Sequence, residues 1–317
     1  MKKMNKKVVI LGGGTGMSTL LRGLKQFPLD LTAIVSVCDD GKSTGILRKE
    51  FNTPAVGDIR RVLISLSETE PLFEKMLNYR FKTDGYLNGH AVGNFLLQAM
   101  QDITGSMSEG IKALGKVLNL NGKVIPLTEN GDITLVAEMI DGKIIEGEHH
   151  ITEEESIIKK VYYKKEPEIT EEALNAIKEA DLIILSVGSL YTSIIPNILP
   201  EKIKEEMKKS KAKIMYVCNI MTQPGETDKY KVSDHINKLN EYLKYRKVDI
   251  VIANNGKISQ YLIDKYSTLE QKEPVILDEE NLENIEIISD NLVKVEEETL
   301  RHDVIKLALD IFTYLLK

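Results

Sequence analysis

The sequence has no tryptophan, two cysteines, and aromatic residues at only 6% of its 317 positions. Two thiols cannot supply the disulfide framework of a small secreted protein. Cys38 and Cys218 each end an apolar segment, where buried and reduced cysteine is common. No apolar run approaches the ~20 residues that span a membrane. The basic residues 1–7 precede a run of four apolar residues, too short for a secretory signal. We therefore expect a cytoplasmic protein without membrane insertion.

A strong charge of either sign is also missing. The net charge is −6 and the pI is about 5.6, with acidic and basic residues mixed along the chain. Such a balance argues against a surface that binds nucleic acid. A hydrophobic content of 42% and a charged content of 28% are typical of globular proteins. The length fits a single α/β domain over 1–317 that is large enough to carry an insertion.

The apolar segments predict a Rossmann-like, doubly wound α/β fold with a mostly parallel sheet. Near-continuous apolar strands alternate with segments of helical spacing, as buried parallel sheets require. The predicted parallel strands are 7–11, 31–37, 182–187, 213–219, 248–254 and 274–277. Helical spacing occurs at 16–26, after the N-cap candidate Asp58, and at 70–81, 92–103, 109–118, 170–179, 201–210, 233–244 and 301–316.

Between 122 and 165 the hydrophobic period changes to two. This pattern predicts a small, β-rich inserted subdomain of antiparallel strands. Asp141-Gly142 is expected to form a type I′ hairpin turn. The predicted strands of the insertion are 123–127, 133–140, 143–151 and 161–163.

Four glycines follow the first strand closely, as Gly12, Gly13, Gly14 and Gly16, with Thr15 between the last two. Glycine lets backbone N–H groups close on a phosphate in front of a helix N-terminus, so this loop predicts an anion-binding turn. The dinucleotide fingerprint itself fails, because Met17 stands where the third glycine belongs. A tight strand-to-helix turn without a ligand is the alternative.

A second polar loop follows the strand at 31–37. It contains Asp39, Asp40, Lys42, Ser43 and Thr44. Its ending imitates a P-loop, but the glycine that a P-loop needs five residues before Gly41 is Ser36, and two carboxylates repel a bare phosphate. Asp39 or Asp40 is expected to hold Mg²⁺ or to accept from ribose hydroxyls. A turn-forming role for these aspartates is the alternative.

Further polar turns come at the ends of predicted strands and helices. Their amides, hydroxyls and charged groups can contact a ligand, whereas capping and turn roles are the alternative. His90 is interpreted as structural, and no Cys/His set has zinc spacing. The candidate ligand contacts in these turns are Asp58, Arg60, Asn94, Ser189, Tyr191, Thr192, Asn219, Thr222 and Gln223.

Together these turns resemble the 2-phospho-L-lactate transferase (CofD)-like family, and within it the gluconeogenesis-factor (YvcK-like) branch. Each motif is weak alone, but their order along nearly the whole chain is specific. The matching motifs are Gly12–Gly16, Asp39-Asp40-Gly41 with Ser43 and Gly45, Gly57–Arg60, Gly89-His90 with Gly93-Asn94, Gly188–Ser193, Asn219–Thr227 and Arg301-His302-Asp303. Lys42 and Ser186-Val187 depart from the branch pattern.

The resemblance implies one ligand crevice in a cytoplasmic Rossmann-like protein. The transferase branch moves a phospholactyl group from a guanosine diphosphate carrier to a deazaflavin with a divalent metal. The other branch binds UDP-sugars and supports cell shape and wall synthesis on non-glycolytic carbon. The resemblance also implies that Tyr266 stacks on uracil and that Arg301 pairs with the diphosphate.

The favoured hypothesis is therefore a non-catalytic, UDP-N-acetylglucosamine-type binding regulator that links gluconeogenic carbon metabolism to peptidoglycan synthesis and cell shape. We expect it to form a homo-oligomer and to have unidentified protein partners. One alternative is a metal-dependent transferase that uses a nucleoside-diphosphate-linked donor, with Asp40 and Asp58 on Mg²⁺. The other is a nicotinamide-dependent oxidoreductase. No catalytic residue is assigned.

Overall fold

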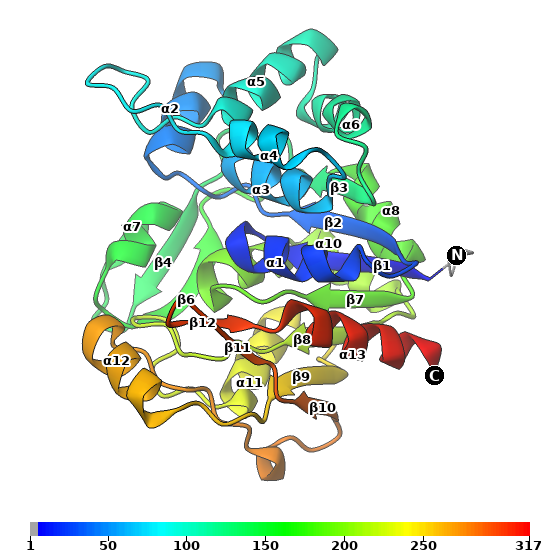
Figure 1. Ribbon diagram of the computed structural model, residues 1–317, viewed down its shortest axis with the longest axis vertical. Helices are drawn as coiled ribbons and strands as arrows, with labels where there is room; N and C mark the ends of the chain where they lie inside the picture. Colours follow the sequence, from blue (N-terminus) through cyan, green and yellow to red (C-terminus); the bar gives the residue numbers. More distant parts are fainter. Residues whose placement is uncertain (1–5) are drawn as a thin grey trace.

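The computed structural model describes residues 6–317, apart from the side chain of Lys42 (Figure 1). Residues 1–5 lie outside the described part. They begin the N-terminal segment that we expected not to be a secretory signal. At the centre is a seven-stranded sheet in the order β10-β9-β8-β7-β1-β2-β3, with every neighbouring pair parallel. The strands are β1 (Lys7–Gly12), β2 (Asp30–Val35), β3 (Lys123–Pro126), β7 (Leu182–Leu185), β8 (Lys213–Val217), β9 (Ile250–Asn254) and β10 (Glu286–Asp290). This confirms the predicted fold class.

Helices cover both faces of this sheet, and successive strand residues alternate between the two cores. Val8 and Ile10 belong to one hydrophobic cluster, while Val9 and Leu11 belong to the other. A strand that is buried on both faces has to be apolar throughout, which explains the continuous run. The first core contains α1 (Gly14–Leu24), α3 (Val56–Leu66), α5 (Val92–Thr104), α6 (Met107–Val117) and α13 (Val304–Leu316). The second contains α8 (Glu171–Glu179), α9 (Ile195–Ile198), α10 (Glu201–Lys209) and α11 (Val232–Leu243).

A separate three-stranded antiparallel sheet occupies the centre of the predicted insertion. Its order is β5-β4-β6, and it packs on the second core beside the main sheet (Figure 1). The elements are β4 (Leu135–Met139), β5 (Ile144–Glu146), α7 (Glu148–Glu153) and β6 (Ile158–Tyr163). The turn between β4 and β5 is present, but it is not type I′, because only Gly142 has a positive φ, +88°. Four residues, 140–143, join the two strands, and glycine takes the left-handed position among them.

Two strand predictions for the insertion are wrong. The segment at 123–127 was expected to be antiparallel, but β3 pairs parallel with β2 at the edge of the main sheet. Val124, Ile125 and Leu127 are all buried, so this run was a two-sided strand and not an alternating one. The strand expected at 143–151 ends at Glu146. The chain then turns at Gly147, where φ is +96°, and enters α7.

The C-terminal part also differs from the prediction. The segment at 274–277 makes an isolated bridge at Pro274 and no strand, and the remaining strand of the sheet is β10. The last helix starts at Val304, where Asp303 caps it by accepting from the backbone N–H of Lys306 at 3.2 Å. Arg301 lies instead in β12 (Thr299–His302), which pairs antiparallel with β11 (Val293–Glu296).

Several helices occur where the sequence pattern predicted only polar turns or nothing. α2 follows the second polar loop directly, and α12 precedes the two-stranded β11–β12 sheet. The additional elements are α2 (Lys42–Phe51), the π-helical turn Leu190–Ile194, α12 (Gln260–Glu270) and the 3₁₀ turn Glu279–Asn281. The helix expected at 70–81 is α4 (Pro71–Asn78). Within residues 6–317 no helix is long and apolar enough to cross a bilayer. Cys38 and Cys218 are free and buried, and burial raises the pKa of both thiols, to about 12 for Cys218.

Candidate functional site

The strand order reverses between β1 and β7, so the loops after these strands diverge and leave a crevice at their carboxyl ends. The glycine loop lies here. A Cβ on Gly16 would collide with the carbonyl oxygen of Val187, so the two loops approach as closely as they do because position 16 is glycine. Gly14 has φ +63°. The N-cap residue of α1 is Gly13, which has no side chain to cap the helix, and the carboxylate of Asp58 lies beside this terminus, 2.7 Å from where a Cβ on Gly13 would be.

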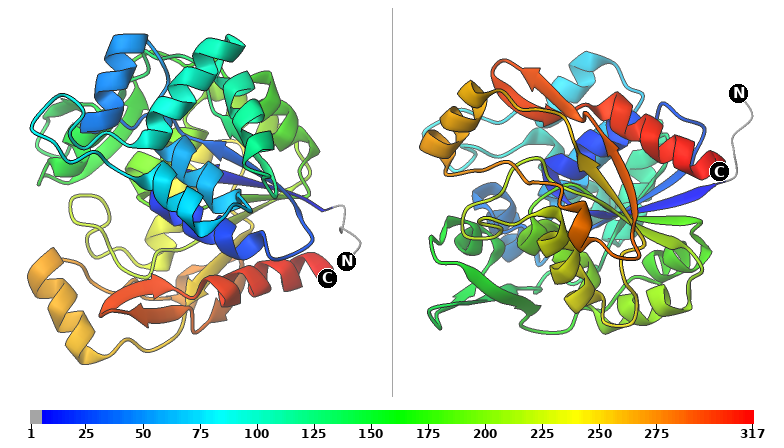
Figure 2. Two further views of the ribbon diagram at one scale, coloured as in Figure 1. Left: turned by 45° about the horizontal axis from the view of Figure 1, so that its top comes forward. Right: turned by 90° about the horizontal axis from the view of Figure 1, so that it is seen from below.

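A cavity of about 410 Å³ opens at this crevice and gathers predicted residues from five separate segments. α12 and the β11–β12 hairpin lie side by side (Figure 2). Tyr266 and Glu270 of α12 and residues 299–302 of β12 line the cavity. Eight of the predicted contacts line the cavity: Thr15, Gly16, Ser189, Asn219, Thr222, Gln223, Tyr266 and Arg301. The strand-end turns therefore meet at one place in space, as the sequence predicted.

Tyr266 and Arg301 reach this cavity from different elements. The Tyr266 ring packs on Leu262 and Leu300 and is only 8% exposed, and its phenolic oxygen accepts from the backbone N–H of Leu300 at 2.9 Å. Arg301 follows Leu300 in β12, and within residues 6–317 its guanidinium group has no hydrogen-bond or ion-pair partner. The cavity thus has an anchored aromatic ring beside an uncommitted guanidinium.

The loop after β7 is held by a buried carboxylate that the sequence analysis did not select. Glu226 accepts from Ser189 Oγ at 2.5 Å and from the Tyr191 N–H at 3.1 Å. Burial raises its pKa to about 7, although both hydrogen bonds lower it. Tyr191 is fully buried, with its hydroxyl 3.3 Å from that of Tyr230, and Thr192 Oγ1 donates to Ser189 Oγ. Tyr191 and Thr192 therefore support the loop and do not line the cavity.

The turn after β8 supports the same loop. The Asn219 side chain accepts from the Gly188 N–H at 3.2 Å and donates to the Gly188 carbonyl at 2.7 Å. The Thr222 N–H donates to the Glu273 carbonyl, and the Thr222 hydroxyl accepts from the Glu273 N–H. Gln223 Nε2 donates to the other oxygen of Glu226. These predicted contact residues line the cavity and also fix its shape.

Carboxylates gather between the glycine loop and the second polar loop. Asp58, on the first turn of α3, accepts from Arg61 Nη1 at 2.8 Å. Burial and then the neighbouring Asp39 raise the pKa of Asp58 to about 6. Glu148 points toward the same region from α7, and burial, Asp39 and Asp58 raise its pKa to about 8. Glu148 was missed because its segment was predicted as an exposed hairpin strand.

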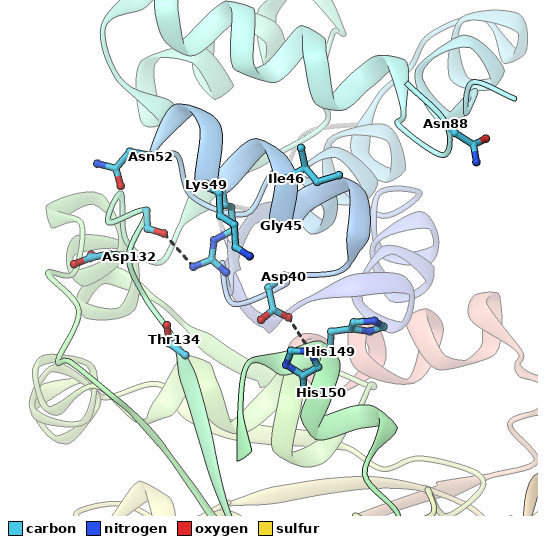
Figure 3. Close-up of a pocket in the computed structure, with 12 residues that line it drawn as sticks. Asp40, Gly45, Ile46, Lys49, Asn52, Asn88, Asp132, Thr134, His149 and His150 are labelled. Atoms are coloured by element: carbon cyan, nitrogen blue, oxygen red, sulfur yellow. Dashed lines mark hydrogen bonds between the residues drawn. The ribbon is translucent and has the colours of Figure 1, made fainter. Parts of the chain in front are cut away.

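The two aspartates of the second loop have different neighbours. Asp39 accepts from the Gly41 N–H and from Thr44 Oγ1, on the side facing α3. Asp40 accepts from the backbone N–H of His149 at 2.8 Å, so it binds the first turn of α7 (Figure 3). It lines a different cavity of about 710 Å³. In the described part of the chain no group of three or more His, Cys, Asp or Glu residues is placed to hold a metal ion. The predicted pairing of Asp40 with Asp58 on Mg²⁺ stays a prediction.

The other predicted residues of this region lie beside a third cavity. Ser43 and Thr44 line it, with a volume of about 440 Å³. Arg60 and Asn94 are buried next to it, at 4% and 1% exposure. The side chain of Lys42 lies outside the described part of the structure. The predicted site residues are therefore divided between the crevice cavity and the surroundings of the second loop.

A parallel sheet with its carboxyl-end loops converging where the strand order reverses defines a doubly wound α/β protein with a switch-point crevice. Residues 8–293 match the family described as 2-phospho-L-lactate transferase CofD, and the chain belongs to this family. It is 46% identical over 311 residues to the gluconeogenesis factor of Halalkalibacterium halodurans, covering 97% of this chain and 95% of the relative. The gluconeogenesis factor of Bacillus subtilis is 45% identical over 305 residues, covering 95% and 96%.

A solved structure supports the fold. The X-ray structure of a protein from Bacillus halodurans superposes with a TM-score of 0.93 at 44% sequence identity. The match covers 98% of this chain and 100% of that one. The parallel sheet and the helices on both faces are thus shared with an experimentally determined relative.

Proposed function

We propose that the crevice binds a UDP-sugar of the UDP-N-acetylglucosamine type, and that binding makes the protein a non-catalytic regulator. The single observation that carries this proposal is the meeting of Tyr266, Arg301 and the glycine loop in one cavity. The names of its relatives support a role in gluconeogenesis. The link to peptidoglycan synthesis and cell shape rests on the resemblance to the same branch.

The chemistry of the lining fits the parts of such a ligand. The Tyr266 ring can stack on a planar pyrimidine, because its phenol is already held by Leu300. Arg301 offers positive charge to a diphosphate, and the glycine loop at the start of α1 offers backbone N–H donors. The hydroxyl of Thr15 and the amide of Asn219 are donors and acceptors for sugar hydroxyls. A volume of about 410 Å³ lies in the range of small-molecule pockets.

Calorimetric titration with UDP-N-acetylglucosamine tests the binding. Arg301→Ala should weaken the affinity by roughly 10- to 100-fold, because it removes charged hydrogen bonds. Lys265→Ala is the matched control, since Lys265 lies next to Tyr266 on α12 but pairs with Glu298 outside the cavity. No heat of binding with the unmodified chain would reject the proposal, as would equal losses in both variants.

The proposed regulatory role is tested by growth of cells. In a bacterium that lacks its own gene for this protein, the unmodified chain and Lys265→Ala should restore growth on a gluconeogenic carbon source. Arg301→Ala should not restore it at equal protein level. Restoration by Arg301→Ala would separate the regulatory role from ligand binding and contradict the proposal.

We infer a second candidate, a metal-dependent transferase with a nucleoside-diphosphate-linked donor, from Asp58 and Asp39. A divalent cation would stabilise the ionised form of Asp58, whose pKa burial and Asp39 raise to about 6. Of the two second-loop aspartates, Asp39 is the better partner for Asp58, because Asp40 is engaged by α7. In this reading Mg²⁺ should raise the melting temperature of the unmodified chain and not of Asp58→Asn. Absence of product from a nucleotide-linked lactyl donor with Mg²⁺ would exclude it.

A further inference from the structure

A cavity of about 570 Å³ lies at the carboxyl end of β9, away from the glycine loop and the second polar loop. We call it the β9 cavity. In the described part of the chain it shares no lining residue with the crevice cavity. Its walls are the loop after β9, the start of α12, and residues 274–280, which run into the 3₁₀ turn at the lower end of the molecule (Figure 1). The apolar part of the lining consists of Ile258, Ile263, Pro274, Val275, Ile276 and Leu277.

The backbone of the wall at 274–280 is held in place on both sides. The Val275 N–H donates to the Ile220 carbonyl at 2.9 Å. The Asp278 carboxylate is only 3% exposed and accepts from the N–H and the hydroxyl of Ser233, at 3.0 and 2.6 Å. These bonds tie the wall to the turn after β8 and to the start of α11. A partner that binds here therefore does not have to order this segment first.

Apolar side chains stay exposed on this fixed backbone. Ile276 is 61% exposed, whereas its neighbour Val275 is 7% exposed. Ile258 and Ile263 on the other wall are half-buried, as is Leu277. Single exposed apolar residues are ordinary on a protein surface, but these side chains share one concave wall. Covering them removes apolar surface from water, so the occupant should bring apolar side chains of its own.

The rim of the cavity is negatively charged. Residues 273–290 contain no lysine or arginine, so this stretch carries a charge of −7, whereas the whole chain carries −6. In the described part of the chain, the one ion pair within the stretch joins Glu286 to Lys317. Of the residues directly beside the lining in sequence, only Lys257 is basic. The seven carboxylates are those of Glu273, Asp278, Glu279, Glu280, Glu283, Glu286 and Asp290.

We propose that the β9 cavity is a docking site for a basic segment of a partner protein, in which apolar side chains alternate with lysine or arginine. The apolar side chains pack on Ile276 and on the facing wall of Ile258 and Ile263. The basic side chains pair with Glu279 and Glu280, which line the cavity and are exposed.

Charge complementarity selects this occupant. A neutral or acidic segment leaves the rim carboxylates without partners, and like charges across an interface are repulsive. A second copy docked by two-fold symmetry brings the acidic stretch of one chain against that of the other. The site goes beyond the proposed function, which leaves the protein partners unidentified, and it does not depend on the ligand in the crevice.

Fluorescence anisotropy with a labelled synthetic peptide that alternates lysine and leucine tests the site on the full chain. We expect saturable binding that weakens as salt is added, because exposed charges are screened. A peptide that alternates lysine and serine should bind roughly tenfold more weakly, since it lacks the apolar contacts. A peptide that alternates glutamate and leucine should not bind. Absence of saturable binding by the lysine–leucine peptide, or equal binding of all three peptides, would overturn the proposal.

Substitution of Ile276 tests the apolar wall. Ile276→Ser should weaken binding of the lysine–leucine peptide by roughly tenfold, because it removes the most exposed apolar contact. Ile140→Ser is the matched control, since Ile140 is 64% exposed and lies outside the cavity. The control should change the affinity by no more than about twofold. Equal losses in the two variants would place the peptide elsewhere on the surface and overturn the proposal.

Substitution of the rim carboxylates tests the charge. Glu279→Gln combined with Glu280→Gln should weaken binding by roughly threefold to tenfold and make it less dependent on salt. Glu155→Gln combined with Glu205→Gln removes the same charge from exposed positions outside the lining, and should leave affinity and salt dependence nearly unchanged. Equal effects of the two pairs would mean that net charge alone attracts the peptide, which would overturn the proposal.

Two other occupants are separated by further measurements. Sedimentation that shows self-association of the unmodified chain and a monomeric Ile276→Ser variant would assign the cavity to a second copy. Spermidine that displaces the peptide with equal affinity would assign it to a free polyamine. Either result would overturn the proposal. Arg301→Ala should leave peptide binding unchanged, so failure of the UDP-sugar proposal and failure of this one are distinguishable.

Discussion

The phenolic oxygen of Tyr266 accepts a 2.9 Å hydrogen bond from the backbone N–H of Leu300, the residue directly before Arg301. This bond joins α12 to β12 at the edge of the crevice. It fixes the aromatic ring relative to the strand that carries the arginine. The two side chains proposed to hold the base and the diphosphate are thus positioned by one contact.

Removing the phenol and removing the ring should have different effects. Tyr266→Phe leaves the Leu300 N–H unpaired, so the free energy of unfolding should fall by about 1–2 kcal/mol, and ligand affinity should fall less than it does when the ring is lost. Tyr266→Ala also removes the stacking surface, and affinity for UDP-N-acetylglucosamine should fall by roughly tenfold. Urea unfolding and calorimetry measure the two effects. Equal affinities for the Phe and Ala variants would show that the ring does not contact the base.

Gly16 should tolerate no side chain. In Gly16→Ala the new Cβ collides with the Val187 carbonyl, so the two crevice loops must separate. We expect the free energy of unfolding to fall by about 1–3 kcal/mol and ligand binding to be lost. Gly85→Ala is the control, because the nearest atom to its Cβ is Thr83 Oγ1 at 3.8 Å, and its effect should stay within about 0.5 kcal/mol. A Gly16→Ala variant as stable as this control would contradict the close approach.

Glu226 should make stability depend on pH. Its pKa rises from 4.5 to about 7 on folding, chiefly through burial, so between these values the folded state binds more protons than the unfolded state. The contribution of Glu226 is therefore fully present below about pH 4.5 and is lost as the pH rises through 7. Relative to Glu226→Gln, the unmodified chain should lose about 3 kcal/mol across this window. Urea unfolding at several pH values measures this, and a constant difference between the two proteins would refute it.

Asn219 should act through the loop that it clamps. Asn219→Ala removes both hydrogen bonds to Gly188, so we expect a loss of about 1–3 kcal/mol in the free energy of unfolding and weaker ligand binding. Asn219→Asp keeps an acceptor for the Gly188 N–H and loses the donor to its carbonyl. Asn219→Asp should therefore lower the free energy of unfolding by less than Asn219→Ala does, because only the hydrogen bond to the Gly188 carbonyl is lost. An Ala variant with unchanged stability and affinity would show that the clamp is dispensable.

Local sequence signals predicted much of this architecture. Continuous apolar runs such as 7–11 and 182–187 identified strands buried on both faces, because helices cover each side of a parallel sheet. The glycine loop after β1 and the polar turns after β7 and β8 could be placed at strand ends, and parallel strands bring those ends to one edge. A crevice shared by these loops therefore follows from the parallel arrangement of the strands.

The predictions that were wrong or incomplete depend on contacts between distant segments of the chain. The segment at 123–127 looked antiparallel because a short apolar run does not reveal its partner, and β3 joined the main sheet instead. Whether Asp39 or Asp40 lies toward Asp58 depends on α7, which arrives from 109 residues away along the chain to engage Asp40. Glu148 falls in a segment predicted as an exposed strand. Glu226 falls in a polar turn, where nothing in the local sequence indicates that it is buried.

The sequence by itself determined the class of fold and which loops end at the crevice, because strand burial and turn chemistry are encoded within a few neighbouring residues. Only the tertiary structure decided how the predicted side chains divide between ligand contact and support. It buried Tyr191 and tied Ser189 to Glu226. Within residues 6–317 it left the Arg301 guanidinium, and Nε and Nη1 of Arg60, without a hydrogen-bond partner. Those outcomes depend on contacts between distant segments, whose energies come from burial and pairing that no local pattern records.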